Sequence, residues 1–388
     1  MKRSEERILT THVGSLPRPE ALLDLASFEK GPPKDQAEYA RVLKASVAEI
    51  VRKQAAVGLD IINDGEFGKE SWANYIIKRI SGFEIRKDQL RVTEWLGSDR
   101  IRFAEFLADD FPRAIQGTPT EACIGPITYQ DKDSIKLALE ALGAALPAVK
   151  VTEAFMTAVA PASTAYDGVN EYYKTDRDYV FAIADALREE YLAIHEAGLL
   201  VQVDDAVLAN MYDALVSQSP QRYREWAQLR IDALNHALRG IPEDRVRYHL
   251  CFGSWHLPHI SDAPLEEIVG FILQVNAGAY SIEAANPRHE HEWRVWETVK
   301  LPAGKILIPG IVTHHIITVE HPRLVADRII RFAKLVGREN VIAGTDCGFA
   351  QIDSIRRVHP EVMWAKFEAL VEGAKIASDE LWGRKAAA

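Results

Sequence analysis

Short apolar runs that suit β-strands alternate with helical patterns along the whole chain, and this alternation restricts the possible folds most. Helical patterns lie between most of the strand runs, for example at residues 36–57, 179–197, 222–239, 263–275, 323–335 and 360–378. The strand runs cover residues 8–16, 59–64, 122–128, 149–159, 199–204, 246–252, 279–283, 305–312 and 341–345. Strands that alternate with helices indicate parallel β-α units, and nearly all-apolar strands suit a sheet covered on both faces.

Eight such units close into a (β/α)8 TIM barrel, so the sequence predicts an α/β fold of this type. Because there are nine strand candidates, we expect one of them to lie outside the barrel wall. A doubly wound open sheet is the main rival, but neither G-x-G-x-x-G after the first strand nor G-x-x-x-x-G-K-[ST] occurs. We interpret residues 1–388 as a single domain, residues 83–117 as an insertion within it, and residues 385–388 as a frayed tail.

Composition and charge exclude several classes of function. The chain has 46 basic and 56 acidic residues, which are spread along it, and this argues against a nucleic-acid partner. No stretch approaches the roughly 20 apolar residues of a membrane span, and the charged start M-K-R-S-E-E-R does not resemble a signal peptide. We therefore expect a cytoplasmic protein without a membrane partner. A homo-oligomer is possible.

Polar residues gather where the predicted strands end. They include His12, Ser15, Asp64, Glu66, Asp204, Asp205, His249, Cys251, Glu283, His314, His315, Asp346 and Cys347. In a parallel barrel the carboxyl ends of all strands share one face, and that face carries the active site. The sequence therefore predicts that six or more separate segments converge on one cavity.

Four of these residues form a candidate zinc site. His249 and Cys251 are two apart in a strand, so their side chains point the same way. Glu283 and Cys347 end two later strands. Thiolate and imidazole ligands suit Zn²⁺, and a carboxylate would be a more readily exchanged fourth ligand. Each cysteine could instead be a buried small hydrophobe, an interpretation that fits Cys123 better than the other two.

Other residues compete for functional roles. His289 and His291 have metal-like spacing, but R-H-E-H-E-W resembles the polar start of a helix, so we expect a solvated or helix-start role. Arg18 and Lys69 could hold an acidic substrate group or be surface charges. The tryptophans at positions 72, 255 and 293 could wall a pocket or pack in the core.

Seven motifs occur in the order found in the cobalamin-independent methionine synthase family, and the chain resembles the catalytic barrel of that family. They are T-T-H-V-G-S-L-P-R-P, N-D-G-E-F-G-K, Q-V-D-D, H-L-C, Y-S-I-E, I-P-G-I-V and G-T-D-C-G. The resemblance implies a zinc ion on His249, Cys251, Glu283 and Cys347. It also implies that Gly14 and Ser15 hold the carboxylate of homocysteine, that Glu66 and Asp204 hold its amino group, and that His315, or His314 after a one-residue shift, moves a proton.

Three departures from that family affect the expected substrates. The chain has no room for the N-terminal half of the full-length synthases. The tryptophan that packs on the pterin is replaced in Thr164-Ala165-Tyr166, and D-E-P reads Asp204-Asp205-Ala206. The first two departures put a folate methyl donor in doubt. The run S-I-E-A-A-N-P-R-H-E-H-E-W is also similar to epoxyalkane:coenzyme M transferases, which open an epoxide with the same chemistry.

The sequence thus favours a zinc-dependent enzyme that transfers a methyl or other alkyl group from an alkyl donor to a small-molecule thiol, with a zinc-bound thiolate as nucleophile. A homocysteine-like acceptor is preferred because paired carboxylates attract an ammonium group and repel a sulfonate. Thiolate opening of an epoxide is the alternative. A zinc hydrolase or decarboxylase and a metal-free binding protein are the alternatives from other classes.

Overall fold

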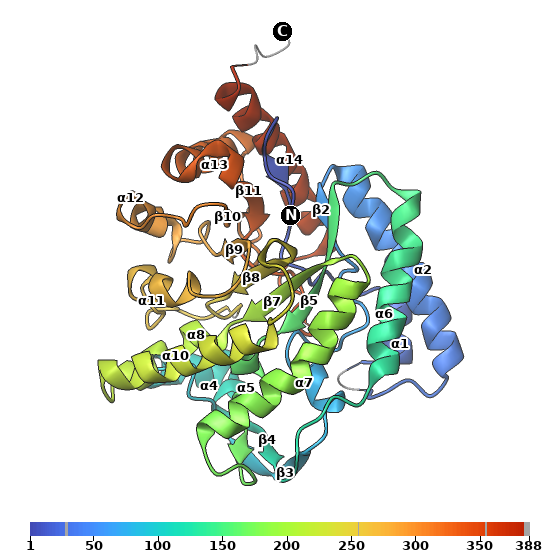
Figure 1. Ribbon diagram of the computed structural model, residues 1–388, viewed down its shortest axis with the longest axis vertical. Helices are drawn as coiled ribbons and strands as arrows, with labels where there is room; N and C mark the ends of the chain where they lie inside the picture. Colours follow the sequence, from blue (N-terminus) through green and yellow to red (C-terminus); the bar gives the residue numbers. More distant parts are fainter. Residues whose placement is uncertain (28–29, 255, 354, 384–388) are drawn as a thin grey trace.

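Eight parallel strands close into a barrel in the computed structural model, which describes residues 1–388 except 28–29, 255, 354 and 384–388 (Figure 1). The strands run in the order β1-β11-β10-β9-β8-β7-β5-β2, and a parallel bridge between Thr11 and Ile61 joins the two ends. The predicted TIM barrel is therefore confirmed, and the open-sheet rival is wrong. The barrel strands are β1 (Leu9–Thr10), β2 (Ile61–Ile62), β5 (Glu153–Val159), β7 (Leu200–Asp205), β8 (Val246–Leu250), β9 (Ala279–Ile282), β10 (Ile306–Val312) and β11 (Ile342–Thr345).

The ninth strand candidate lies outside the wall, as expected. Residues 122–128 overlap β4 (Thr118–Cys123), which pairs with β3 (Phe83–Arg91) and β6 (Val169–Asn170) in a small second sheet. Between β3 and β4 lie the short helices α3 (Asp99–Arg102), α4 (Ala104–Asp110) and α5 (Pro112–Gln116). Figure 1 places this unit at one end of the molecule. That residues 83–117 are an insertion within a single domain stays a prediction.

Helices surround the barrel, and several have the end signals that a sequence can encode. The side chain of Asp35 caps α2, which ends at Gly58 in the left-handed conformation, with φ 99°. Ser219 caps α10, whose first residue is Pro220. The α-helices of this layer are α1 (Glu20–Leu25), α2 (Gln36–Val57), α6 (Lys132–Ala145), α7 (Asp176–Glu196), α8 (Val207–Asn210), α9 (Tyr212–Val216), α10 (Pro220–Ala237), α11 (Leu265–Ile272), α12 (Val295–Thr298), α13 (Pro322–Val336) and α14 (Pro360–Leu381). The 3-10 helices are η1 (Asn74–Lys78), η2 (Leu146–Ala148), η3 (Pro161–Ser163), η4 (Glu243–Arg245), η5 (Glu290–Arg294) and η6 (Arg338–Asn340).

Side chains fill the interior of the barrel, so it is a packed core. Arg247 on β8 is fully buried there, with its guanidinium 4.0 Å from the ring centroid of Phe155. This group donates to Thr11 Oγ1 and to the carbonyl of His12, so the charge is solvated by polar groups. The other barrel strands contribute an apolar cluster of Leu9, Ile61, Phe155, Leu200, Ala279, Ile306, Ile308 and Ile342.

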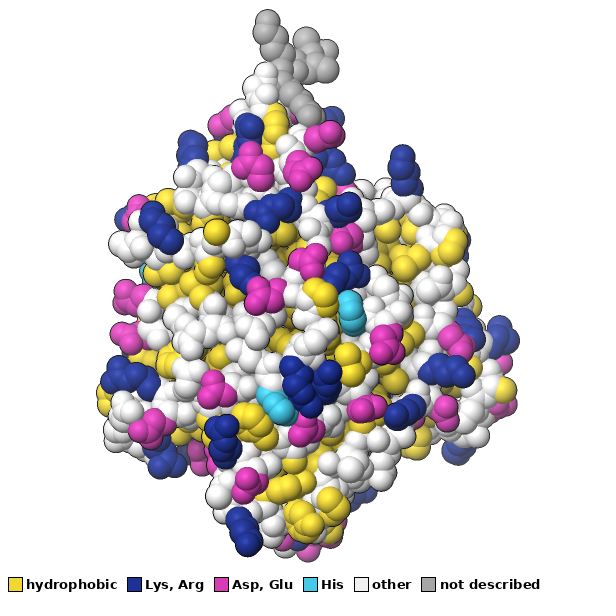
Figure 2. Space-filling view, in the orientation of Figure 1, with side chains coloured by type: hydrophobic (Ala, Val, Ile, Leu, Met, Phe, Trp, Pro, Cys, Tyr) yellow, Lys and Arg dark blue, Asp and Glu magenta, His cyan; other side chains and the backbone are white. Residues whose placement is uncertain are grey.

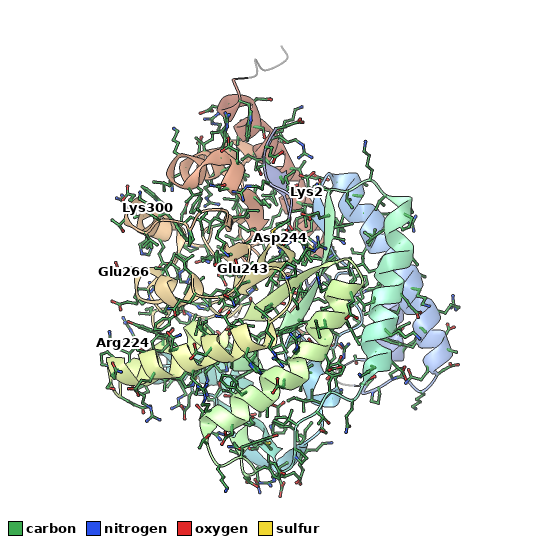
Figure 3. All side chains as sticks on the ribbon, viewed as in Figure 1. Lys2, Arg224, Glu243, Asp244, Glu266 and Lys300 are labelled. Carbon is green, nitrogen blue, oxygen red and sulfur yellow. The ribbon has the colours of Figure 1, made fainter. Side chains whose placement is uncertain are left out.

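The two ends of the barrel differ in what they carry. Lys2 precedes β1, and Glu243 and Asp244 precede β8; all three lie near the centre of the view in Figure 3. The predicted site residues follow the strands and so lie at the opposite end. Acidic and basic side chains are interspersed over the face drawn in Figure 2. None of the helices among the described residues is long and apolar enough to cross a membrane.

Candidate functional site

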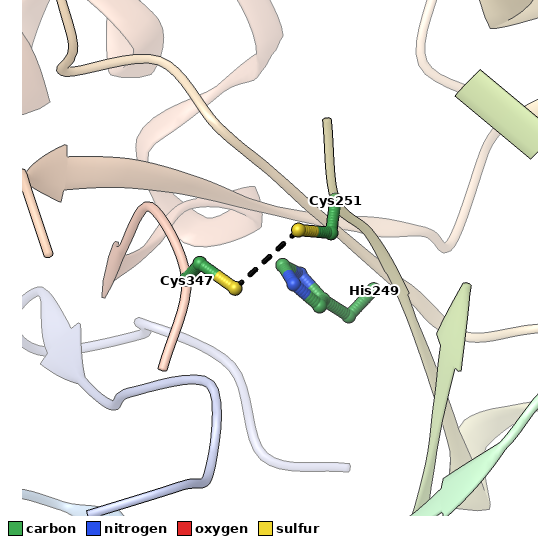
Figure 4. A group of neighbouring side chains, drawn as sticks. All are labelled: His249, Cys251 and Cys347. Atoms are coloured by element: carbon green, nitrogen blue, oxygen red, sulfur yellow. Dashed lines mark hydrogen bonds between the residues drawn. The ribbon is translucent and has the colours of Figure 1, made fainter. Parts of the chain in front are cut away.

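Three ligand-type side chains meet at the carboxyl ends of β8 and β11. His249 is the second-last residue of β8. The backbone N–H of Cys251 continues the pairing with β7 by donating to the carbonyl of Asp205 at 2.9 Å. Because the chain is extended here, both side chains point to the same side of the strand. Cys347 follows β11 after one residue. Figure 4 shows the three side chains turned toward one another.

The geometry of this group fits a metal ion. One donor atom from each of His249, Cys251 and Cys347 lies within 4.8 Å of the others, and the two sulfur atoms are 3.5 Å apart. Both ring nitrogens of His249 are buried without a hydrogen-bond partner among the described residues. A buried polar atom without a partner costs about 1–3 kcal/mol. An ion bound at these atoms would remove that cost, and two sulfurs with one imidazole are the donors that Zn²⁺ accepts.

The two thiols of this group differ in how their surroundings shift their pKa values. Burial alone would raise the pKa of Cys347, but the contact with Cys251 and the imidazole of His249 lower it well below its usual range. The neighbouring Cys347 sulfur, together with burial, raises the pKa of Cys251. The amide of Gly253 donates to Cys251 Sγ at 3.2 Å, and Gln351 Nε2 lies 3.7 Å from Cys347 Sγ. Each sulfur thus has a nearby donor that would stabilise negative charge on it.

Glu283 lies in a second group beside the first. Its carboxylate shares a 4.8 Å cluster with His314 and Asp346, and that cluster is also buried. Glu283 Oε1 accepts the backbone N–H of Phe252 at 3.1 Å, and Oε2 accepts Asn286 Nδ2 at 2.9 Å. The structure thus groups three of the four predicted ligands. The fourth, Glu283, is linked to this group through the N–H of Phe252, the residue after Cys251. That Glu283 is the fourth ligand stays a prediction.

The two histidines predicted to move a proton occupy different positions. His314 is 1% exposed, lies in the cluster with Glu283, and has two ring nitrogens without a hydrogen-bond partner. His315 is half-buried, and its ring lies 5.7 Å from that of His256. Burial lowers the pKa of both, to about 4 for His315. Of the two, His314 therefore lies deeper and beside the candidate metal ligands.

A cavity opens onto the cysteine–histidine group. Its lining includes all three members of that group together with Ser15, Glu66 and Asp204. Gly14 lies behind the lining. Its φ of 150° and the absence of a side chain matter, because a Cβ atom there would stand 2.6 Å from Glu66 Oε1. Similarly, a Cβ atom on Gly348 would stand 2.1 Å from Ser15 Oγ, so the segment after Cys347 packs directly on the Gly14–Ser15 segment.

Glu66 is held in a strained turn with its carboxylate toward this cavity. Its φ is 60°, a conformation that costs about 1–3 kcal/mol for a residue other than glycine. Asp64 Oδ1 accepts the Glu66 N–H at 3.0 Å and so fixes the turn. The side chain is 2% exposed, Oε2 has no hydrogen-bond partner among the described residues, and burial raises the pKa of the carboxyl group. An ammonium group would satisfy that oxygen.

Asp204 stands beside His249 because β7 and β8 pair in that register. Gln202 Nε2 donates to its Oδ1 at 2.8 Å, and burial raises the pKa of Asp204 to about 7. The next residue, Asp205, has a different role. It accepts from Ser163 Oγ at 2.8 Å and Tyr248 Oη at 3.0 Å, so it ties neighbouring elements together.

Several residues around the cavity were not predicted from the sequence as parts of the site. Arg357 lines it and donates through Nε to Gln351 Oε1 at 2.7 Å, which fixes the amide beside Cys347. Trp95 reaches the cavity from the 83–117 segment, and Tyr166 also lines it. None of these residues belongs to a polar cluster directly after a barrel strand. A search for polar residues at strand ends therefore does not find them.

The remaining competing residues also have defined positions. Trp72 lines the cavity, Trp293 packs against the core elsewhere, and Trp255 is outside the described residues, as are 385–388. Arg18 and Lys69 are buried, so neither is a surface charge. Arg18 donates to the carbonyls of Glu66 and Lys69 at 3.0 Å each, and Lys69 Nζ donates to Thr157 Oγ1 at 2.9 Å.

The fold and the site together define a class of protein, the TIM-barrel enzymes. In these, as here, the cavity and the candidate metal centre lie at the carboxyl ends of the strands. The family model for the catalytic domain of cobalamin-independent synthase matches residues 8–132 and 160–366. The chain therefore belongs to this family. It is an enzyme of methyl transfer like the methionine synthases.

Individual relatives agree with this assignment. A methionine synthase of Thermococcus kodakarensis is 24% identical over 385 residues, which cover 96% of this chain and 94% of the relative. One from Saccharolobus solfataricus is 23% identical, with 96% and 95% covered. The fold matches a B12-independent methionine synthase from Shewanella sp. W3-18-1, in complex with selenomethionine, at a TM-score of 0.73 and 19% identity, covering 97% of this chain and 99% of that one.

Proposed function

We propose that this chain is a zinc-dependent methyltransferase that alkylates the sulfur of a homocysteine-like thiol. The observation that carries the proposal is the shared cavity. Two buried carboxylates, Glu66 and Asp204, line the same space as His249, Cys251 and Cys347. An amino-acid thiol has an ammonium group that the two carboxylates can bind. It also has a sulfur that can bind a metal held by the histidine and the two cysteines. Both carboxyl groups are buried, and an ammonium group in this space would have two oxygen acceptors beside the candidate metal ligands.

The proposed metal is Zn²⁺, held by His249, Cys251 and Cys347, with Glu283 as a fourth ligand. Zinc with two thiolate ligands lowers the pKa of an added thiol while leaving its sulfur nucleophilic. The chain's own groups do the rest. Glu66 and Asp204 would hold the ammonium group, and Gly14 and Ser15 the carboxylate, so that the sulfur faces the donor carbon.

The reaction balances without a redox partner. The thiol gives up its proton to water or a nearby base, a sulfur–carbon bond forms, and the bond between the methyl carbon and the donor breaks with its electron pair on the donor. The donor then takes a proton, for which His314 and His315 are the candidates. The comparisons support the methyl-transfer reaction and lend no support to epoxide opening.

A thiol panel tests the proposal on the purified enzyme. X-ray absorption at the zinc edge should gain a Zn–S contact at about 2.3 Å with homocysteine. Coenzyme M and glutathione serve as comparison thiols, because the first has a sulfonate and lacks the amino group, and the second is a tripeptide whose amino group lies much farther from its sulfur. Gain of the contact with coenzyme M alone would favour the epoxide reaction. Protein that holds no stoichiometric zinc after reconstitution, or never gains a Zn–S contact, would favour a metal-free or hydrolytic role.

A further inference from the structure

The H-E-H-E run at residues 289–292 contains two histidines with very different surroundings. His289 precedes η5 and is 4% exposed, whereas His291 is exposed within η5. The expected helix-start position is correct for His289, but a solvated role is wrong for it. The two side chains diverge because η5 winds, so they do not act as a pair. His291 instead provides a control for experiments on His289.

Both ring nitrogens of His289 are bound to carboxylates. Nδ1 lies 2.8 Å from Glu292 Oε2, and Nε2 lies 3.0 Å from Asp262 Oδ2. Ionised carboxylates only accept hydrogen bonds, so both nitrogens of this ring must carry a proton. The ring then has no lone pair for a metal, and it is a buried cation between two anions. In agreement, the two carboxylates, against the opposing effect of burial, raise the pKa of His289 to about 10.

This clamp joins two segments that flank the candidate metal centre. Asp262 also contacts His259 Nδ1 at 3.0 Å, and Glu292 Oε1 accepts the N–H of Leu265 at the start of α11 at 2.7 Å. Asp262 and Leu265 belong to the connection that leaves β8, and Glu292 belongs to the one that leaves β9. His289 therefore fastens the loop after Cys251 to the loop after Glu283.

Two routes lead from His289 to the carboxylate of Glu283. The ring of Phe252 stacks on the imidazole, with centroids 3.9 Å apart and planes 28° apart, and the Phe252 N–H donates to Glu283 Oε1. The backbone N–H of His289 donates at 3.2 Å to Asn286 Oδ1, and the other end of that amide donates to Glu283 Oε2, so this second route starts from the main chain and not from the imidazole. Each oxygen of Glu283 is thus held by a group that itself contacts His289.

We propose that His289, clamped between Asp262 and Glu292, is a positioning residue that fixes Glu283 and the turn after Cys251 in the geometry that the metal requires. This inference rests on the proposed zinc site. It gives the H-E-H-E run a role in support of the ligands, without making it a ligand itself. Groups that orient metal ligands in this way typically change metal affinity about 10–100-fold when removed.

Zinc affinity of the purified full chain, measured by competition with a chromophoric chelator, tests the proposal. We expect His289→Gln to weaken zinc binding at least about tenfold and His291→Gln to leave it within about twofold of wild type. Circular dichroism and thermal unfolding separate this effect from a loss of folding. A role in folding alone would lower Tm and leave the zinc affinity of the folded protein unchanged.

Phe252→Leu provides the second variant if His289→Gln fails to fold. It keeps an apolar side chain but removes the ring that stacks on the imidazole, and we expect at least about threefold weaker zinc binding. A folded His289→Gln or Phe252→Leu protein with wild-type zinc affinity would overturn the inference while leaving the proposed function intact. Wild-type protein that binds no zinc would overturn both.

Discussion

Two buried groups of ligand-type residues lie side by side at the mouth of the barrel, and they differ in how their polar atoms are satisfied. In the first, both nitrogens of His249 lack partners and two sulfurs are in contact. In the second, all four carboxylate oxygens of Glu283 and Asp346 accept N–H groups. Asp346 Oδ1 accepts two backbone N–H groups at 2.8 Å, Glu283 Oε1 accepts the N–H of Phe252, and Asn286 Nδ2 donates to Glu283 Oε2 and Asp346 Oδ2. The donor atoms of the first group are open to an ion, whereas in the second group the carboxylates already have partners and only the ring nitrogens of His314 lack one among the described residues.

The largest expected effect comes from the open group. We expect Cys251→Ser or Cys347→Ser to remove stoichiometric zinc and to lower activity at least about a hundredfold, because an alcohol is a poor substitute for a thiolate ligand. Cys123→Ser is the matched control, since that buried cysteine lies in the second sheet. Elemental analysis and turnover assays give the readout. Full zinc content in either site variant would remove it from the ligand set.

Variants of His314 and His315 test whether the group of Glu283, His314 and Asp346 takes part in proton transfer. We expect His314→Gln to lower kcat about a hundredfold, as is usual for loss of a proton-transfer group, and His315→Gln to lower it only a few-fold. The reason is position: His314 is buried beside Glu283, whereas His315 is half-buried next to His256. Steady-state kinetics at saturating thiol decide between them. The reverse order would assign the proton to His315.

The carboxylates across the cavity should affect binding more than chemistry. We expect Glu66→Gln and Asp204→Asn each to raise the KM for homocysteine about tenfold, because each loses a charged hydrogen bond worth roughly 1.5–3 kcal/mol. Zinc content should stay the same. Thiols without an amino group should show little change between wild type and variant. Equal effects on both kinds of thiol would argue against an ammonium contact.

Asp346→Asn should have the smallest effect on catalysis and act on stability instead. The amide keeps an acceptor for the Ala284 and Ala285 N–H groups but loses the charge, so we expect the free energy of unfolding to fall by about 1–2 kcal/mol. Zinc affinity should change little. Denaturant unfolding of the purified variant measures the first, and chelator competition the second. Loss of zinc would mean that Asp346 itself takes part in binding the ion.

Much of the fold could be predicted from the sequence because its signals are local. The 36–57 helix coincides with α2, which an aspartate caps and a glycine ends. Strand ends were also predictable, because apolar runs stop where polar residues begin. The small sheet was harder, since β3 is charged and mostly exposed and carries no strand-like alternation.

The candidate site was only partly predictable. His249 and Cys251 share a side by strand geometry alone, but the grouping of Glu283 with His314 depends on how the loops after β9 and β10 fold. A shift of one residue in β10 decides which histidine is buried, and spacing cannot fix that. Asp262 and Glu292 are far apart in sequence, so only the folded chain reveals that they bind the same imidazole.

The join between β1 and β2 is where substrate binding should stabilise the barrel most. The described ladder there is one bridge, Thr11 to Ile61, whereas β5 and β7 pair over five positions. Ser15 and Glu66 follow these two strands, one on each side of the join. A thiol held by both would link the two strands across the shortest described strand ladder of the barrel. Substrate should therefore slow amide hydrogen exchange along that line, since binding to the closed form stabilises it.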